Sequence, residues 1–183
     1  MKTIAGRRSG RRPDFPADLV TPTIRPARPE DASAVVDVWF EGWWDGHGAV
    51  APERLRRFRD RAGLAGRVDR LIPAMKVAEI EGRIVGFVAI SSDELADLFV
   101  LRAARGTAVA SRLLAEGEAM LAEAGVREAF LWCAVGNDRA FRFYIREGWR
   151  DGGIVQCDVA TPDGPARLPS HRMLKVPTLR GGA

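Results

Sequence analysis

The chain has 183 residues, a length typical of a single domain whose hydrophobic core needs neither disulfides nor a structural metal. Hydrophobic residues make up 46% of it, which excludes a disordered chain, and the net charge of +4 is modest. Two cysteines and two histidines form no familiar metal-ligand spacing, so we expect no bound metal. The longest apolar run, 84–90, is too short to cross a bilayer, which takes about 20 residues.

The first 22 residues predict a basic, disordered tail, because lysine and arginine crowd the first twelve positions among glycine, serine and proline. Nucleic-acid binding is the alternative for this tail. We expect no nucleic-acid partner, because no aromatic residue lies between these charges to stack on bases. The pair Arg7-Arg8 is followed by no apolar segment, so we expect no signal peptide, no membrane partner and a cytoplasmic location. A single domain is expected over 23–177, with a C-terminal tail over 178–183.

The N-terminal part of this domain predicts a short strand at 23–25 and two helices. Pro29 suits the first turn of a helix, and the apolar residues from 35 to 43 recur at helical spacing. We expect the glycine-containing segment 43–48 to break this helix and Pro52 to open a second one. The apolar side of the second helix is expected to hold Leu55, Phe58, Ala62 and Ala65.

The rest of the domain predicts strands joined first by turns and later by helices. The dipeptide Glu81-Gly82 between two strand-like runs predicts a hairpin. We expect strands at 75–80, 83–90, 94–100, 129–135, 149–160 and 171–176, and helices at 109–124 and 138–147. Gly117 lies on the apolar stripe of the first of these helices, which indicates close approach to a sheet. The predicted fold class is α/β (α+β), a mixed sheet with helices on both faces.

The stretch 100–114 predicts an anion site. A strand ends at Val100, a loop of small residues follows, and a helix begins near Val109. In this arrangement several backbone N–H groups and the positive end of the helix dipole point to one place, which favours a phosphate. Many α/β proteins have such a turn for packing alone, so this stretch is weak evidence by itself.

A second informative stretch covers 137–149. Its pattern consists of Asn137, Ala140, Phe143, Tyr144, Gly148 and Trp149. Asn137 can cap the helix that follows it, and Gly148 can end that helix. Together the two stretches resemble the GNAT family of acetyltransferases. In that family Gln or Arg, two residues, Gly, one residue and Gly or Ala form the first motif, and Asn-x-x-Ala-x-x-Phe-Tyr-x-x-x-Gly-aromatic forms the second. The resemblance covers roughly 24–176 and is strongest over 94–149.

The resemblance implies a mostly antiparallel central sheet in which a splayed pair of central strands holds acetyl-CoA as co-substrate, without a metal. The cofactor-binding residues that it implies are Phe99, Val100, Arg105, Gly106, Thr107, Ala108, Val109, Ala110, Ser111, Asn137, Phe143 and Tyr144. Ala108 departs from the family pattern, which usually has its first glycine there. We expect its methyl group to weaken cofactor binding without preventing it.

The resemblance also implies direct transfer of acetyl to an amine, helped by three groups. A backbone N–H near Val100 would bind the developing oxyanion. Glu94 is the first choice for the base, because the family's glutamate precedes the valine position by six residues. Asp97 is the second choice, because strand alternation points it to the other face unless a bulge intervenes. Tyr144 would donate a hydrogen bond to the departing thiolate.

The resemblance places the acceptor site between residues 39 and 70, where Trp43, Trp44 and His47 are the candidate substrate-binding residues. They would form an apolar pocket with polar ends for a small-molecule or peptide amine. Burial of both tryptophans in a core or interface is the alternative. We expect a small amine as acceptor; protein N-termini or lysines, or a non-catalytic acyl-CoA-binding regulatory role, are the alternatives. The resemblance also allows a homodimer.

Overall fold

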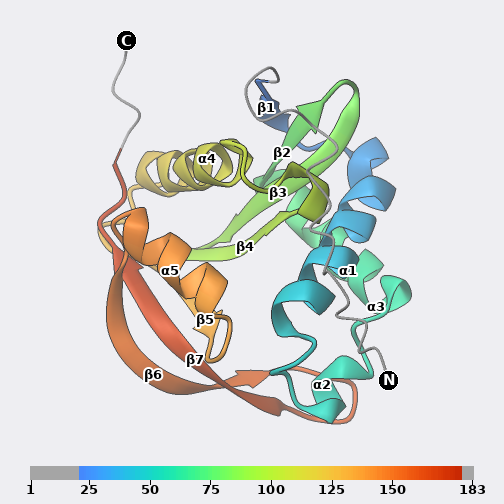
Figure 1. The fold of residues 1–183 in the computed structure, drawn as a ribbon, viewed down its shortest axis with the longest axis vertical. Coiled ribbons are helices and arrows are strands. Elements are labelled where there is room, and N and C mark those ends of the chain that lie inside the picture. Colours follow the sequence, from blue (N-terminus) through green and yellow to red (C-terminus); the bar gives the residue numbers. More distant parts are fainter. Residues whose placement is uncertain (1–20, 179–183) are drawn as a thin grey trace, which may run out of the picture.

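The computed structural model describes residues 21–178, which form one seven-stranded sheet flanked by helices (Figure 1). The strands are β1 (Thr23–Pro26), β2 (Met75–Ile80), β3 (Arg83–Ser91), β4 (Glu94–Val100), β5 (Ala129–Ala134), β6 (Arg150–Val159) and β7 (Ala166–Lys175). The α-helices are α1 (Ala32–His47), α2 (Glu53–Arg56), α3 (Arg61–Leu71), α4 (Val109–Glu123) and α5 (Asp138–Arg146). Short 3-10 turns are η1 (Pro29–Asp31), η2 (Ile72–Ala74) and η3 (Arg102–Ala104). The predicted tails lie outside the described residues, except for 21, 22 and 178.

The strand order is β1-β2-β3-β4-β5-β7-β6, and every neighbouring pair is antiparallel except β4 and β5. The predicted mixed, mostly antiparallel sheet is therefore confirmed. Strands β2–β4 lie between α4 on one side and α1 with α3 on the other, while α5 lies beside the β5–β7 half (Figure 1). Gly117 lets α4 approach the sheet, because a Cβ there would lie 2.8 Å from Cγ2 of Val88.

The two halves of the sheet part between β4 and β5. These parallel strands share one register pair, Glu94 with Phe130, and the Phe130 N–H donates to the Asp93 carbonyl oxygen at 3.1 Å. Beyond this point β4 pairs only with β3, and β5 pairs only with β7, within the described residues. The sheet is therefore splayed at its centre.

Helix α1 does not break at 43–48 as the sequence predicts, but continues to His47. Its glycines allow close contact rather than ending the helix. A Cβ at Gly42 would lie 2.8 Å from Cδ1 of Phe99, and one at Gly46 would lie 3.1 Å from Nδ2 of Asn137. The C-terminal half of α1 therefore packs closely against β4 and against the loop that precedes α5.

The single helix predicted from Pro52 is wrong, because two helices, α2 and α3, occupy this region. The side chain of Asp60 accepts a hydrogen bond from the Gly63 N–H at 2.7 Å and so caps a new helix. The predicted apolar side is also wrong in part, since Ala62 and Ala65 are exposed and Leu64 and Val68 are buried instead. The last strand likewise begins at Ala166 rather than 171, because it pairs with β6 along its whole length.

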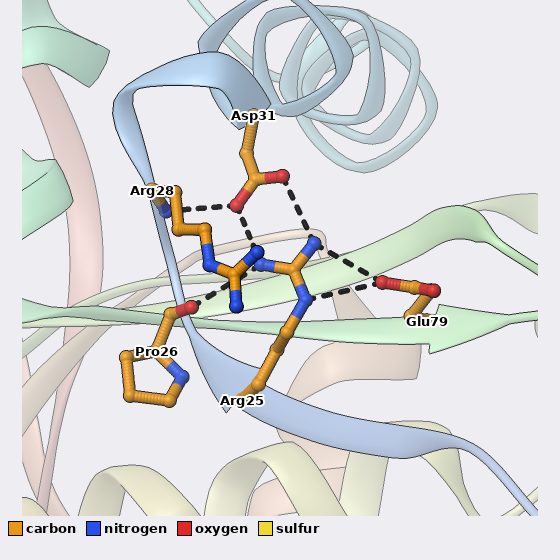
Figure 2. Close-up of polar contacts among 5 residues, drawn as sticks. All are labelled: Arg25, Pro26, Arg28, Asp31 and Glu79. Carbon is orange, nitrogen blue, oxygen red and sulfur yellow. Dashed lines mark hydrogen bonds and ion pairs between the residues drawn. The ribbon is translucent and has the colours of Figure 1, made fainter.

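The N-terminal edge of the sheet is fixed by one arginine (Figure 2). The Arg25 guanidinium donates to both carboxylate oxygens of Asp31, at 2.7 and 3.0 Å, and to Glu79 on β2 at 3.1 Å. Asp31 also accepts the Arg28 backbone N–H at 2.8 Å. This network joins β1, the start of α1 and β2, so that α1 leaves the sheet edge in a defined direction.

Helix α4 is tied to the C-terminal strands by a buried carboxylate. Glu118 accepts hydrogen bonds from Trp149 Nε1 at 2.8 Å and from Lys175 Nζ at 2.8 Å. Because both partners belong to the β5–β7 half, this contact holds the two halves of the splayed sheet together. Over residues 21–178, no helix is both long and apolar enough to span a membrane.

Candidate active site

A cavity of about 1020 Å³ opens where β4 and β5 separate. Its walls come from α1, the loop between α2 and α3, α3, β4, the loop before α4 and the first turn of α4, β5, α5 and β6. The predicted site residues that line it are Trp43, His47, Glu94, Asp97, Phe99, Val100, Arg105, Gly106, Thr107, Ala110, Ser111, Asn137, Phe143 and Tyr144. Trp44, Ala108 and Val109 are not among its lining residues. Two motifs far apart in the sequence thus meet at one cavity.

The loop before α4 presents a row of unpaired backbone amides. The N–H groups of Gly106, Thr107, Ala108, Ala110 and Ser111 donate to no group among residues 21–178, whereas the Val109 N–H is bound by Thr107 Oγ1 at 3.3 Å. Thr107 Oγ1 in turn donates to the Ala104 carbonyl oxygen at 2.6 Å, which closes the loop. Free amides at the start of a 15-residue helix are suited to binding an anion.

Ala108 has a φ of −76°, a value that alanine adopts without strain. The residue with a left-handed conformation is Gly106, whose φ is +78°. A glycine is therefore required at 106 but not at 108 for this loop shape. The expected weakening of cofactor binding by the methyl group of Ala108 stays a prediction.

Three arginines near this loop share one carboxylate, that of Asp45 at the end of α1. Asp45 contacts Arg102 and lies 2.7 Å from both Arg105 and Arg139. Burial alone would raise the pKa of Asp45, but the three guanidiniums together lower it to about 2. Asp45 is therefore charged at neutral pH and joins α1 to the amide loop and to α5.

The two candidate bases, Glu94 and Asp97, both line the cavity. Simple alternation would separate them, but the pairing of β3 with β4 shifts register between Ala89 and Ser91, opposite these two acids. From Ala89 to Ser91, β3 advances by two residues, while the paired stretch of β4, from Asp97 to Glu94, advances by three. β4 therefore carries the one extra residue of a bulge. Because the bulge interrupts the alternation of side chains along β4, Glu94 and Asp97 can face the same side of the sheet.

Asp97 has the more strongly perturbed carboxyl group. Burial raises its pKa to about 7, the nearby charge of Arg67 lowers it and the charge of Glu94 raises it further. Burial and the charge of Asp93 also raise the pKa of Glu94. A carboxylate with a pKa near 7 can accept a proton from an amine and release it at neutral pH.

Tyr144 from α5 lies across the splay from these acids. Its ring is 9% exposed and packs against Phe143 and Trp149, with centroids 5.3 and 6.2 Å away. Burial raises the pKa of its hydroxyl, and the charges of Cys133 and Asp97 raise it further. The hydroxyl makes no hydrogen bond with any described residue, so it is a neutral donor free to bind a ligand.

The strand itself aims a backbone donor at the splay. The Leu101 N–H donates to the Val85 carbonyl oxygen of β3 at 2.8 Å. Because alternate residues of an antiparallel strand face the same neighbour, the Val100 N–H points away from β3 and towards β5. At this position β5 has already diverged, so nothing on that side pairs with β4.

The predicted acceptor residues divide between the cavity and the surface. Trp43 is 5% exposed and stacks on His47 with ring centroids 5.5 Å apart. Burial lowers the pKa of His47 to about 4, and its Nδ1 is buried without a hydrogen-bond partner of good geometry in the described chain. Trp44 is 40% exposed, and its Nε1 donates to the Arg59 carbonyl oxygen at 3.0 Å. Trp44 thus holds the loop between α2 and α3.

Sequence reasoning missed the arginines that enter the cavity from this loop and from α3. Arg59, Arg67 and Arg70 all line it, and Arg59 is 6% exposed. An arginine between two short helices is typical of a solvated surface, so no signal in the sequence marks it as buried. Groups of three or more His, Cys, Asp or Glu placed to hold a metal do not occur in the described part of the chain.

Family and structural comparisons place the chain among known proteins. Residues 36–149 match the model of the acetyltransferase (GNAT) family, which spans both motifs. The chain belongs to the GNAT family. Uncharacterized N-acetyltransferases of Mycobacterium tuberculosis and Mycobacterium bovis are 32% identical over 114 residues, covering 57% of this chain and 73% of each relative. The resemblance seen in the sequence is therefore confirmed, and the chain is an acetyltransferase by family.

Solved GNAT structures share the fold. One from Rhodopseudomonas palustris superposes with a TM-score of 0.69 at 20% identity, covering 85% of this chain and 96% of its own. An N-acetyltransferase from Thermoplasma acidophilum in complex with coenzyme A gives 0.64 at 20% identity, with 85% and 99% covered. A putative acetyltransferase from Salmonella typhimurium with acetyl-CoA gives 0.66 at 15% identity, with 89% and 98% covered. These identities show the fold alone.

Proposed function

We propose that this GNAT protein is an acetyl-CoA-dependent N-acetyltransferase that acetylates the amine of a small molecule. The observation that carries the proposal is the set of free amides of Gly106, Thr107, Ala110 and Ser111, residues that line the same cavity as Asp97 and Tyr144. The free amides supply donors for a diphosphate, and the acid and the phenol supply the groups that amine acetylation needs.

The residues of the amide loop fit acetyl-CoA, with Arg105 and Arg139 adding positive charge at its edge. When bound, acetyl-CoA supplies a thioester whose acetyl group an amine can attack. Val100 offers its backbone N–H to the carbonyl oxygen in the splay, as its orientation away from β3 supports.

Asp97 is proposed to take the proton from the ammonium form of the acceptor, because burial and, to a smaller extent, the charge of Glu94 raise its pKa to about 7. Sequence spacing alone favoured Glu94 as the base, but the pKa of about 7 favours Asp97 for this role. Tyr144 donates a hydrogen bond to the leaving sulfur and keeps its own proton, because burial raises its pKa. The cytoplasmic location and the homodimer stay predictions.

Calorimetric titration with acetyl-CoA, followed by a thiol-release assay over small amines and over peptides with free N-termini or lysines, tests this function. Binding with turnover of a small amine supports it. Turnover of peptides alone would indicate a protein acetyltransferase instead. Binding without any turnover would indicate a regulatory acyl-CoA-binding domain, and no binding would contradict both readings.

A further inference from the structure

Arg59 is a buried cation without a counter-ion. Its side chain is 6% exposed, and over residues 21–178 its guanidinium makes no hydrogen bond and no ion pair. It lies over the ring of Trp43, with 5.7 Å between Cζ and the ring centroid. Burying an arginine without an anion is unfavourable, and burial lowers the pKa of Arg59 to about 10. The structure around Arg59 is therefore short of one negative charge.

This cation shares the cavity with the proposed base. Arg59 and Asp97 both line it, and each shifts the pKa of the other, although no ion pair joins them. Arg67 lines the same wall, with its guanidinium 4.9 Å from the centroid of Trp39 and no ion pair in the described chain. A ligand in this part of the cavity meets two guanidiniums beside a carboxylate that is half protonated near pH 7.

Arg59 lies over Trp43 on the wall made by α1 and the loop between α2 and α3, whereas Arg105 and Arg139 pair with Asp45 beside the amide loop. The charges that shift the pKa of Arg59 are those of Arg67 and Asp97. The charges that shift the pKa of Arg105, at the amide loop, are those of Arg139, Asp45 and Arg102. The charges of both groups reach His47 between them, but among residues 21–178 only the group at the amide loop shares a carboxylate, that of Asp45.

Resting on the proposed acetyltransferase function, we propose that the acceptor is a small amine that also carries an anionic group, a carboxylate or a phosphate, bound by Arg59. A guanidinium presents a planar pair of N–H donors that matches the oxygens of either group. The amine of the same molecule would then lie beside Asp97, and apolar parts would contact Trp43 and Phe99.

The test compares paired acceptors that differ by the anionic group. The pairs are L-phenylalanine with 2-phenylethylamine, L-leucine with 3-methylbutylamine, and O-phosphoethanolamine with ethanolamine. Thiol release gives kcat/KM for the wild type, Arg59→Gln, Arg59→Lys and the control Arg61→Gln. Arg61 has the same charge two positions along the chain, but it is exposed, pairs with Asp37 at 2.6 Å and does not line the cavity. Ratios of variant to wild type remove differences in amine reactivity.

We expect Arg59→Gln to lower kcat/KM for the anionic member of at least one pair by about 100-fold. The neutral member should change by less than about threefold, and Arg61→Gln should leave both unchanged. Arg59→Lys keeps the charge without the planar donor pair, so it should lose about tenfold. The amino-acid pairs and the phosphoethanolamine pair distinguish a carboxylate from a phosphate.

Two further readouts separate this role from a structural one. The melting temperature of Arg59→Gln should equal or exceed that of the wild type, because an uncompensated buried charge is removed, and its Kd for acetyl-CoA should not change. Equal losses on neutral and anionic acceptors, or weaker acetyl-CoA binding, would overturn the proposal. An Arg59→Gln variant that turns over the anionic members as efficiently as the wild type does would overturn it while keeping the acetyltransferase function. No turnover of any amine would overturn both.

Discussion

Two groups of arginines, each with members that line the same cavity, are neutralised differently. Arg102, Arg105 and Arg139 surround the carboxylate of Asp45. Arg59 and Arg67 have no such partner in the described chain, and burial raises the pKa of Asp97, an acid whose charge acts on Arg59, to about 7. The first group carries its anion within the protein, and the second group is complementary to an anion that must come from a ligand.

The first group of arginines has a structural role, whereas the second group is suited to binding a ligand. A carboxylate shared by three guanidiniums fixes α1, the amide loop and α5 in one arrangement, because losing it would leave like charges together. The unpaired guanidiniums of Arg59 and Arg67, beside the partly protonated Asp97, hold no elements of the fold together. They favour the binding of a molecule of opposite charge. The variants at Asp97 and Asp45 below each change one side of this contrast.

The largest effect is expected for Asp97→Asn, which removes the proposed base. We expect kcat/KM to fall at least about 100-fold with acetyl-CoA affinity unchanged. Because the deprotonated form is active, wild-type kcat/KM should rise with pH and level off above about 7, and this dependence should vanish in the variant. Steady-state kinetics from pH 5.5 to about 9 measure both.

Glu94→Gln is the matched control for Asp97. Because the charge of Glu94 raises the pKa of Asp97, this variant should lose less activity and should shift the rise in kcat/KM to lower pH. A greater loss for Glu94→Gln than for Asp97→Asn would reverse the assignment of the base.

The next largest effect is expected for Asp45→Asn. This variant removes the carboxylate and leaves the arginines of the first group without a counter-ion, as those of the second group already are. We expect the free energy of unfolding to fall by about 2 kcal/mol, less than for a fully buried pair, because Arg102 and Arg139 are well exposed. Urea unfolding measures this. Added sulfate should stabilise the variant more than the wild type, because anions can replace the lost carboxylate.

Asp37→Asn provides the control for Asp45, because Asp37 pairs with a single, well-exposed arginine, Arg61. Its removal should change the free energy of unfolding by no more than about 1 kcal/mol. Equal losses in the two variants would mean that the shared carboxylate has no special structural role.

A smaller effect on rate is expected for Tyr144→Phe. Because the raised pKa keeps the phenol protonated, its loss should remove one hydrogen bond and lower kcat about tenfold. Single-turnover thiol release isolates this step. A loss of many thousandfold in a folded variant with normal acetyl-CoA affinity would instead require full proton transfer from Tyr144.

The smallest effect is expected at a paired arginine outside the cavity. Arg25→Gln should lower the free energy of unfolding at pH 7 by about 1 kcal/mol. The hydrogen bonds from Arg25 lower the folded-state pKa of Asp31 below its usual 3.8, so this stability is present above that value and is lost as pH falls through the folded pKa. Urea unfolding at pH 7 and near pH 3 should therefore show a smaller difference between variant and wild type in acid.

Elements with a strong local pattern could be predicted from the sequence. The hairpin at Glu81-Gly82 is confirmed, with both residues at positive φ, and Asn137 caps α5 as expected. The end of α1 could not be predicted, because Gly46 looks like a helix breaker until Asn137 is brought against it. The β4 bulge and the burial of Arg59 likewise depend on contacts between distant segments.

The residues of the candidate site could likewise be predicted where they lie in a continuous motif, but not where they depend on contacts between distant segments. The amide loop and Tyr144 lie in continuous motifs and are brought to one cavity. The choice between Glu94 and Asp97 depended on a register shift and on burial, neither of which spacing reveals. The charge of the acceptor pocket depended on which arginines have partners, and this is a property of the folded chain.

The central claim is that the amides between Gly106 and Ser111 bind a diphosphate. Calorimetric titration with acetyl-CoA, dephospho-CoA, 4′-phosphopantetheine and pantetheine tests it most directly. The account predicts that dephospho-CoA, which keeps the diphosphate, binds nearly as well as CoA, and that pantetheine binds about 100-fold more weakly. Equal affinity for pantetheine and CoA, or no binding of CoA, would contradict it.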